Sequence, residues 1–257
     1  MTRAAIIVVG GGARRLNGVA KPWLSIGGIP IIDRIINSVE PHVQQCVLVG
    51  EVPEWWRRDD VEWTREEPAG TGPAAAVRAG FEVLAPTVDE VLLLAGDAPM
   101  IAAPLAALLA HDLPGDGAMI EVDGRLQFLC ARLRRPALER ALASGDASMR
   151  SVYEHLQVAT VSAVLTDCDT WEDVARLRQE IPMNDWLNEV AAKLGIDPTI
   201  DVDAVLELTR DVAHNLERKN APLTSYLLGF AAAKQNLTAA QIAALAADIG
   251  AMAKDRA

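Results

Sequence analysis

A glycine-rich loop near the N-terminus carries the first residues that could do chemistry. The stretch from Val8 to Lys21 reads VVGGGARRLNGVAK, in which three consecutive glycines, Gly10 to Gly12, precede Arg14, Arg15 and Lys21. Glycine lets backbone N–H groups approach an anion without a Cβ in the way, and the cations can neutralise phosphate oxygens. Three cations exceed what one carboxylate needs, so the loop favours a triphosphate ligand. The alternative is a glycine-rich turn whose arginines are simply solvated.

The loop fits neither of two well-known phosphate-binding patterns. A P-loop requires Ser or Thr after its lysine, whereas Lys21 is followed by Pro22. The dinucleotide fingerprint requires a third glycine where Arg15 stands. Lys21 is also the only lysine among residues 1–182. Either the composition simply prefers arginine, or this position needs a compact ammonium group that a guanidinium does not mimic.

A second candidate is Asp97, which follows a buried apolar strand in the segment LAGDAPM, residues 94–100. Ligands of open α/β sheets gather at the carboxyl ends of strands, and an aspartate placed there can hold Mg²⁺ against phosphate oxygens. Asp97 could equally cap the helix that follows Pro99.

Further carboxylates crowd the segment TDCDTWEDV at residues 166–174. Asp167 or Asp169 could complete a metal site beside Asp97, because the segment also follows a strand. The remaining carboxylates, Glu172 and Asp173, are better explained as caps of the next helix.

The segment EEPAGTGPAAAVRAG, residues 66–80, is a glycine- and proline-rich turn before a helix of small residues. Such a turn offers backbone N–H groups at a helix N-terminus and could frame a flat base. An ordinary strand–helix loop would have the same composition.

No protein nucleophile stands out in the sequence. His42, His111, His155 and His214 are scattered without metal-ligand spacing, and no Ser/His/Asp or Cys/His arrangement appears. Loop cations plus Mg²⁺ match phosphoryl or nucleotidyl transfer, in which the enzyme mainly positions groups and neutralises charge.

These residues must be positioned by alternating strands and helices. Short apolar runs predict strands at residues 4–10, 44–50, 61–66, 89–97, 118–133 (two strands across the hairpin dipeptide Asp123–Gly124) and 158–165. Helical spacing predicts helices at 29–40, 72–84, 104–113, 135–143, 148–156 and 171–181. The alternation predicts an α/β fold in which helices cover both faces of a mostly parallel sheet.

The pattern changes after Pro182, which predicts a nucleotide-handling domain at 1–182 and a second domain at 183–257. Four amphipathic helices are expected there, with Leu223, Leu227 and Phe230 on one face of the third. Thr238 and Gln241 form a capping-box pattern at the start of the fourth. The second domain is therefore expected to be a small all-α bundle.

Composition excludes several classes of partner. The net charge of −11 argues against nucleic acid or an anionic membrane. No apolar run approaches the roughly 20 residues of a transmembrane helix, and no signal peptide precedes the first strand. The three widely spaced cysteines indicate neither a disulfide framework nor a zinc site. A cytoplasmic location is expected.

Several motifs together resemble a known family. GGGARRLNGVAKPWLSIGGIPIIDR resembles the signature of small-molecule nucleotidyltransferases. EEPAGTGPAAAVRAG, LAGDAPMI, DGRLQFLCARLRRPAL, GDASMRSV and DCDTWEDV follow in the order of the molybdenum cofactor guanylyltransferases, the MobA-like nucleotidyltransferases. The resemblance covers about residues 3–180. The C-terminal segment resembles a small helical domain of bacteria that has no assigned function.

The resemblance implies a fold and a reaction. The fold is a Rossmann-like three-layer α/β/α domain with a mixed, mostly parallel sheet. In the reaction, the phosphate of molybdopterin attacks the α-phosphate of GTP and releases pyrophosphate. The implied cofactor is Mg²⁺, and the implied partners are GTP, a molybdopterin-type acceptor and a molybdoenzyme or another protein of the cofactor pathway.

The resemblance also implies roles for individual residues. Backbone groups of Val8, Val9, Gly10, Gly11 and Gly12 would contact the nucleotide. Arg15 and Lys21 would hold the phosphates, and Asp97 would bind Mg²⁺ and the triphosphate, which makes these three the expected catalytic residues. Glu67 and Gly72 would lie beside the base, and Asp169 would be a second metal contact.

The sequence also departs from the family pattern. Ala20 replaces the aspartate that normally precedes the lysine, and Trp171 replaces a proline. Two alternatives to guanylyl transfer therefore stay open. One is a nucleotidyltransferase of the same fold that uses CTP or a sugar phosphate. The other is a catalytically silent nucleotide-binding protein that acts through its helical domain.

Overall fold

The structure is a computed structural model. It describes residues 1–10, 20–54, 56–143, 145, 148–166, 168, 170, 173–174, 176–177, 185–196 and 201–256. The chain forms two compact units. The first comprises Met1–Trp23 and Ile31–Trp171, and the second comprises Leu24–Pro30 and Glu172–Ala257. The predicted boundary between residues 182 and 183 lies outside the described residues and stays a prediction.

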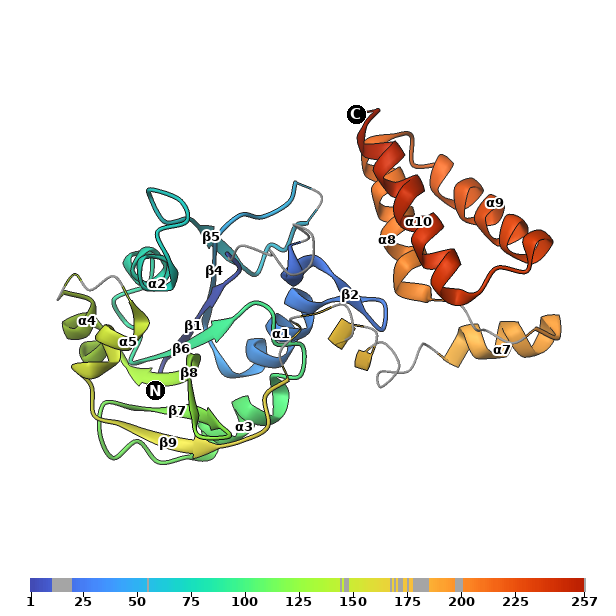
Figure 1. Cartoon of the computed structure of the whole chain (residues 1–257). Helices are drawn as coiled ribbons and strands as arrows, with labels where there is room; N and C mark the ends of the chain where they lie inside the picture. The colour runs from blue at the N-terminus through green and yellow to red at the C-terminus, as the bar shows by residue number, and fades with distance from the viewer. Residues whose placement is uncertain are drawn as a thin grey trace. The chain divides into compact units, whose positions relative to one another are not determined.

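The first unit is built on a seven-stranded sheet with the strand order β5-β4-β1-β6-β8-β7-β9 (Figure 1). Only β8 runs antiparallel to its neighbours, so the mixed, mostly parallel sheet expected from the sequence is confirmed. The strands are β1 (Arg3–Val8), β4 (Gln45–Val49), β5 (Glu62–Thr64), β6 (Glu90–Ala95), β7 (Gly117–Val122), β8 (Arg125–Arg134) and β9 (Val158–Ser162).

Helices cover both faces of this sheet. On one face, α2, α4 and α5 pack on a core that includes Ile6 and Leu93, and α1 and α3 lie together on the other side of the sheet (Figure 1). The bounds are α1 (Ile31–Val39), α2 (Pro73–Glu82), α3 (Ala102–Ala110), α4 (Arg135–Ala143) and α5 (Met149–Glu154), with short 3₁₀ helices η2 (Lys21–Trp23) and η3 (Glu40–His42). The three-layer α/β/α fold is therefore confirmed.

Apolar spacing explains these elements. The interior strand β1 is buried on both faces, with Ala4, Ala5, Ile6 and Ile7 fully inaccessible, as expected for a parallel strand between two helical layers. The hairpin predicted at Asp123–Gly124 is also present: both residues have positive φ, 49° and 74°, and they join β7 to β8.

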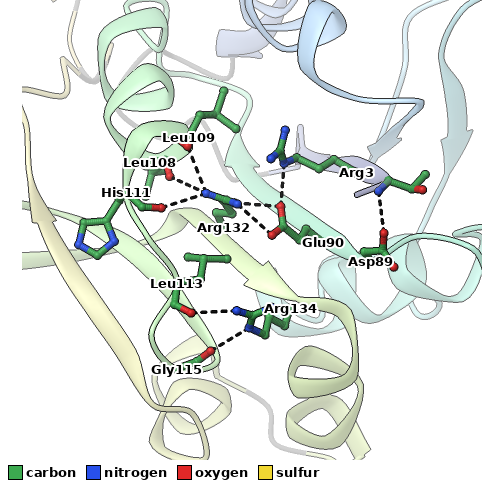
Figure 2. A network of polar contacts seen from close by, with 11 residues as sticks. Arg3, Asp89, Glu90, Leu108, Leu109, His111, Leu113, Gly115, Arg132 and Arg134 are labelled. Carbon is green, nitrogen blue, oxygen red and sulfur yellow. Dashed lines mark hydrogen bonds and ion pairs between the residues drawn. The ribbon is translucent and has the colours of Figure 1, made fainter.

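A buried ionic network ties the sheet to α3, at the edge opposite the carboxyl end of β6. The Glu90 carboxylate, 1% exposed, accepts hydrogen bonds from Arg132 at 2.9 and 3.0 Å and from Arg3 at 2.7 Å (Figure 2). The same Arg132 guanidinium donates to the backbone carbonyls of Leu108 and His111 at the end of α3. The network therefore fixes the helix that follows Asp97 relative to β6 and β8.

In its described residues, the second unit contains a short hairpin followed by several helices. The hairpin consists of β2 (Ser25–Ile26) and β3 (Ile29–Pro30), and the helices include α7 (Asp185–Leu194), α8 (Val202–Asn215), α9 (Asn220–Gln235) and α10 (Ala239–Lys254). The predicted capping box is confirmed, because Thr238 and Gln241 bond each other's backbone N–H groups. Among the described residues, no helix combines the length and the apolarity needed to span a lipid bilayer.

Helix α9 differs from the sequence interpretation. Leu223, Leu227 and Phe230 share a face as expected, but their exposures are 60%, 63% and 58%, so this face does not enter the core. The core that α8, α9 and α10 form takes Leu228 and Ala221 from α9 instead. Three- and four-residue spacing identifies a common face, but does not say which of two apolar faces the neighbouring helices cover.

The ionic network predicts an acid-dependent stability. Burial alone would raise the pKa of Glu90, but hydrogen bonds from Arg132 and Arg3 outweigh burial and hold that pKa below its usual value. The carboxylate therefore stabilises the fold fully above the ordinary glutamate pKa of about 4.3, and this contribution disappears as the pH falls through the lower folded pKa. Glu90→Gln is expected to cost about 3 kcal/mol near neutral pH and to flatten the acid dependence.

Urea unfolding at a series of pH values measures both effects. Glu82→Gln, at an exposed position of α2, is the matched control and should follow the wild type. Parallel pH profiles for the wild type and Glu90→Gln would contradict the assigned role of the network.

Candidate active site

The carboxyl ends of three neighbouring parallel strands define the site. In the sheet register Val8 pairs with Val49 on β4 and with Ala95 on β6. The ladder continues beyond β1, because Val9 N–H donates to the Val49 carbonyl and Gly96 N–H donates to the Val8 carbonyl, both at 2.9 Å. The chain segments that leave β1, β4 and β6 therefore start side by side at one edge, where ligands of open α/β sheets bind.

A cavity of about 190 Å³ lies at this edge and brings two predicted residues together. Lys21 Nζ is 3.5 Å from Asp97 Oδ2, and Val8, Val9 and Gly10 line the same cavity. The Asp97 side chain keeps 34% of its surface exposed, so its carboxylate is accessible to a ligand. The cavity thus combines an ammonium group, a carboxylate and a glycine backbone.

Local structure holds Lys21 at this place. The residue opens η2, in which Trp23 N–H donates to the Ala20 carbonyl at 3.2 Å. Pro22 and Trp23 are buried, and the Trp23 ring lies 5.4 Å from that of Trp56 in a tilted arrangement. The two anchored residues fix the backbone that carries the lysine.

Close backbone approach at the strand ends requires glycine at two positions. A Cβ added to Gly50, whose φ is 138°, would lie 2.9 Å from the Gly10 backbone nitrogen. A Cβ on Gly96 would lie 2.9 Å from Val9 Cγ1 and 3.0 Å from the Val8 carbonyl oxygen. At each position the shortest distance, 2.9 Å, is below the range of real Cβ contacts. A side chain at Gly50 or Gly96 would therefore displace the start of the glycine-rich loop.

A second cavity, of about 570 Å³, adjoins the first and shares Val8, Gly10 and Leu129 with it. Gly72, a predicted site residue, lines this larger cavity together with Pro73, the first residue of α2. The N-cap residue of α2 is Gly72, which has no side chain that could cap the first backbone N–H groups. The positive end of the helix dipole at this cavity wall favours an anionic or hydrogen-bond-accepting ligand.

Two acidic residues, Glu51 and Glu66, line the larger cavity. The Glu66 carboxylate accepts a hydrogen bond from Gly70 N–H at 2.9 Å. The predicted Glu67 is exposed and does not line the cavity, so its role beside a base stays a prediction. The sequence interpretation also missed Arg65, which lines this cavity; its place at the end of the predicted strand 61–66 was the available signal.

Four predicted site residues lie outside the described residues, so their roles stay predictions. They are Gly11, Gly12, Arg15 and Asp169. The neighbouring Cys168 is buried, and its N–H donates to the Asp97 carbonyl at 3.3 Å. This bond brings Cys168 to the backbone of Asp97.

The Asp97 carboxylate is the candidate metal ligand of the smaller cavity. Across the described parts of the chain, no three His, Cys, Asp or Glu side chains gather closely enough to hold a metal ion. Mg²⁺ differs from structural metals in that one or two carboxylates and the substrate phosphates suffice to bind it. The partly exposed carboxylate of Asp97 fits that requirement.

A third cavity, of about 660 Å³, lies away from the predicted residues, between β8, α5 and β9. Arg125, Phe128, Arg150 and Tyr153 contribute to its walls. Burial raises the pKa of Tyr153, so the phenol stays protonated and donates to the Phe128 carbonyl at 3.0 Å.

The chain is similar to two kinds of characterised protein. It is 26% identical over 166 residues to a molybdenum cofactor guanylyltransferase of Shewanella amazonensis, a match that spans 62% of this chain and 84% of the relative. It is 27% identical over 173 residues to the bifunctional protein GlmU of Coxiella burnetii, which spans 64% of this chain but only 36% of that longer protein.

Solved structures confirm the fold. The molybdopterin-guanine dinucleotide biosynthesis protein A of Archaeoglobus fulgidus superposes with a TM-score of 0.54 at 20% identity, covering 69% of this chain and 97% of that one. A 2-C-methyl-D-erythritol 4-phosphate cytidylyltransferase of Thermus thermophilus superposes with a TM-score of 0.53 at 13% identity, covering 70% and 99%. At these identities the likeness concerns the fold alone.

Family models divide the chain into two matched regions. Residues 178–257 match a domain of unknown function, DUF6457. Residues 5–161, more than half of the chain, match the MobA-like NTP transferase domain. The matched residues include Val8 to Gly10, Lys21 and Asp97, which line the smaller cavity. The chain therefore belongs to the MobA-like NTP transferase family.

Proposed function

We propose that this protein transfers GMP from GTP to the phosphate of molybdopterin, with release of pyrophosphate and with Mg²⁺ as cofactor. The observation that supports this proposal most is the pairing of Lys21 with Asp97 at the carboxyl edge of the sheet. A cation that can hold phosphates and a carboxylate that can hold Mg²⁺ occupy one cavity beside the glycine backbone of the loop.

The two adjoining cavities suit the two ends of a nucleoside triphosphate. The smaller cavity, with Gly10, Lys21 and Asp97, would take the phosphates. The larger cavity, with Gly72 and the N-terminus of α2, would take the base and ribose. In this placement Glu51 and Glu66 would be the acidic residues that line the pocket of the base and ribose.

The chemistry asks the protein mainly for charge neutralisation. An oxygen of the acceptor phosphate forms a bond to the α-phosphorus of GTP, and the bond from that phosphorus to the bridging oxygen breaks, so pyrophosphate leaves with the electron pair. Lys21 would exchange its contact with Asp97 for phosphate oxygens and stabilise the developing charge. Mg²⁺ held by Asp97 would supply further neutralisation of the phosphates.

The guanine and molybdopterin assignments rest on the relatives. The guanylyltransferase of Shewanella amazonensis matches over most of its length, whereas GlmU matches over about a third. The cytidylyltransferase fold neighbour favours a second candidate, transfer from another nucleotide to another phosphate acceptor. A third candidate is a silent nucleotide-binding protein, because Ala20 lines the smaller cavity where the family carries an acid.

Lys21→Ala tests the phosphate assignment. Removal of the ammonium group is expected to lower the rate of pyrophosphate release from GTP and molybdopterin by about 10²-fold or more, because this charge acts on the departing phosphates. The measurement is steady-state pyrophosphate release, with thermal unfolding as a check on the fold. Lys219→Ala, on the exposed surface of the helical region, should retain wild-type turnover. Wild-type turnover in Lys21→Ala would remove Lys21 from the site.

Asp97→Asn tests the metal assignment. The amide is nearly isosteric but is a poor Mg²⁺ ligand, so GTP affinity measured with Mg²⁺ is expected to fall by about 1–2 orders of magnitude. Affinity measured with EDTA should change little. Titration calorimetry in both buffers makes the comparison, with the exposed Asp112→Asn as control. An equal loss in both buffers would mean that Asp97 does not act through the metal.

A further inference from the structure

Two carboxylates of α8 bind the backbone of the β2–β3 hairpin. Asp203 accepts hydrogen bonds from two consecutive backbone groups, Gly27 N–H at 2.9 Å and Gly28 N–H at 2.6 Å, one on each carboxylate oxygen. Glu207, one helical turn further on, accepts from Ser25 N–H at 3.2 Å. One face of α8 therefore satisfies three backbone donors of a short hairpin about 175 residues earlier in the chain.

This contact is buried and closely packed. Asp203 is 3% exposed and Ser25 is 4% exposed. Asp203 lies in the first turn of α8, where the helix dipole favours a negative charge. Both turn glycines have positive φ, 60° and 78°, and a Cβ on Gly28 would lie 3.3 Å from Leu206 Cδ1. Only glycine combines this turn geometry with so close an approach of the helix.

The bound hairpin is continuous with the segment that carries Lys21. Lys21 opens η2, which ends at Trp23, and β2 begins at Ser25. Pro22, Trp23 and Leu24, which connect Lys21 to the hairpin, are buried. Only these three residues separate Lys21 from β2 along the chain.

We infer that Asp203 is a positioning residue for the nucleotide site: by holding the β2–β3 turn, the helical region fixes the segment that carries Lys21. The DUF6457 region would then have a role in nucleotide binding, because the contact of Asp203 with the turn would affect the affinity for the nucleotide. The inference rests on the proposed function only in taking Lys21 as a phosphate ligand. Because coupling free energies are reciprocal, bound nucleotide should in turn strengthen the hold of Asp203 on the turn.

The experiment compares Asp203→Ala with Asp211→Ala in the full-length protein. Asp211 lies two turns further along α8 and pairs with Lys254 of α10 at 2.9 Å, so its loss disturbs the helical region without touching the hairpin. Hydrogen–deuterium exchange reports on residues 20–30, and titration with Mg²⁺ and GTP gives the nucleotide affinity. Asp203→Asn, which keeps one acceptor oxygen, should fall between the wild type and Asp203→Ala.

Asp203→Ala is expected to lose amide protection from Gly27 and Gly28 back to Lys21, and to bind GTP about tenfold more weakly. Asp211→Ala should keep both properties. In a Lys21→Ala background the effect of Asp203→Ala on affinity should vanish, because the two residues act through one contact. A purely structural role would leave the two effects additive.

Two outcomes would overturn the inference. One is a loss of protection confined to residues 25–28, because Lys21 would then be independent of the hairpin. The other is an equal loss of affinity in Asp203→Ala and Asp211→Ala. The exchange measurement needs no nucleotide. It therefore tests the coupling between Asp203 and the Lys21 segment even if the protein does not transfer GMP. A failure of this inference can thus be distinguished from a failure of the proposed function.

Discussion

The parallel register between β1 and β6 is the constraint on which the site depends. Because Val8 pairs with Ala95, the glycine-rich loop and the Asp97 loop leave the sheet at the same level and side by side. A shift of the register would separate Gly10 from Asp97, and the start of the glycine-rich loop would then no longer lie beside the Asp97 loop. Gly50 and Gly96 strengthen the constraint, since any side chain at either position would collide with the backbone that leaves β1.

Residues far from the site maintain this register. The network of Glu90, Arg132 and Arg3 lies at the ends of β6 and β8 that are remote from the site. It also holds the C-terminal end of α3. The Asp97 loop is thus anchored at both ends, by the β1–β6 ladder before it and by α3 after it. An isolated charge in this position would destabilise the protein, whereas the complete network connects three elements.

Much of the fold and part of the site were predictable from local sequence. Buried apolar runs identified the strands, and their carboxyl ends identified Asp97 and the glycine-rich loop, since ligand sites in such sheets follow from topology. Glu66 lines the larger cavity whereas Glu67 is exposed, because successive side chains of an extended chain point in opposite directions. The contact of Asp203 with Gly27 and Gly28 had no local signal: a carboxylate in a first helical turn usually serves its own helix.

The central claim is the proposal that this sheet edge transfers GMP from GTP to molybdopterin. The most direct test is pyrophosphate release by the wild-type protein with Mg²⁺ and molybdopterin, in parallel reactions with GTP, CTP, ATP and UTP. The account predicts release with GTP that depends on molybdopterin, and little with the other three nucleotides. Release that is faster with CTP, or GTP binding without any release, would contradict it.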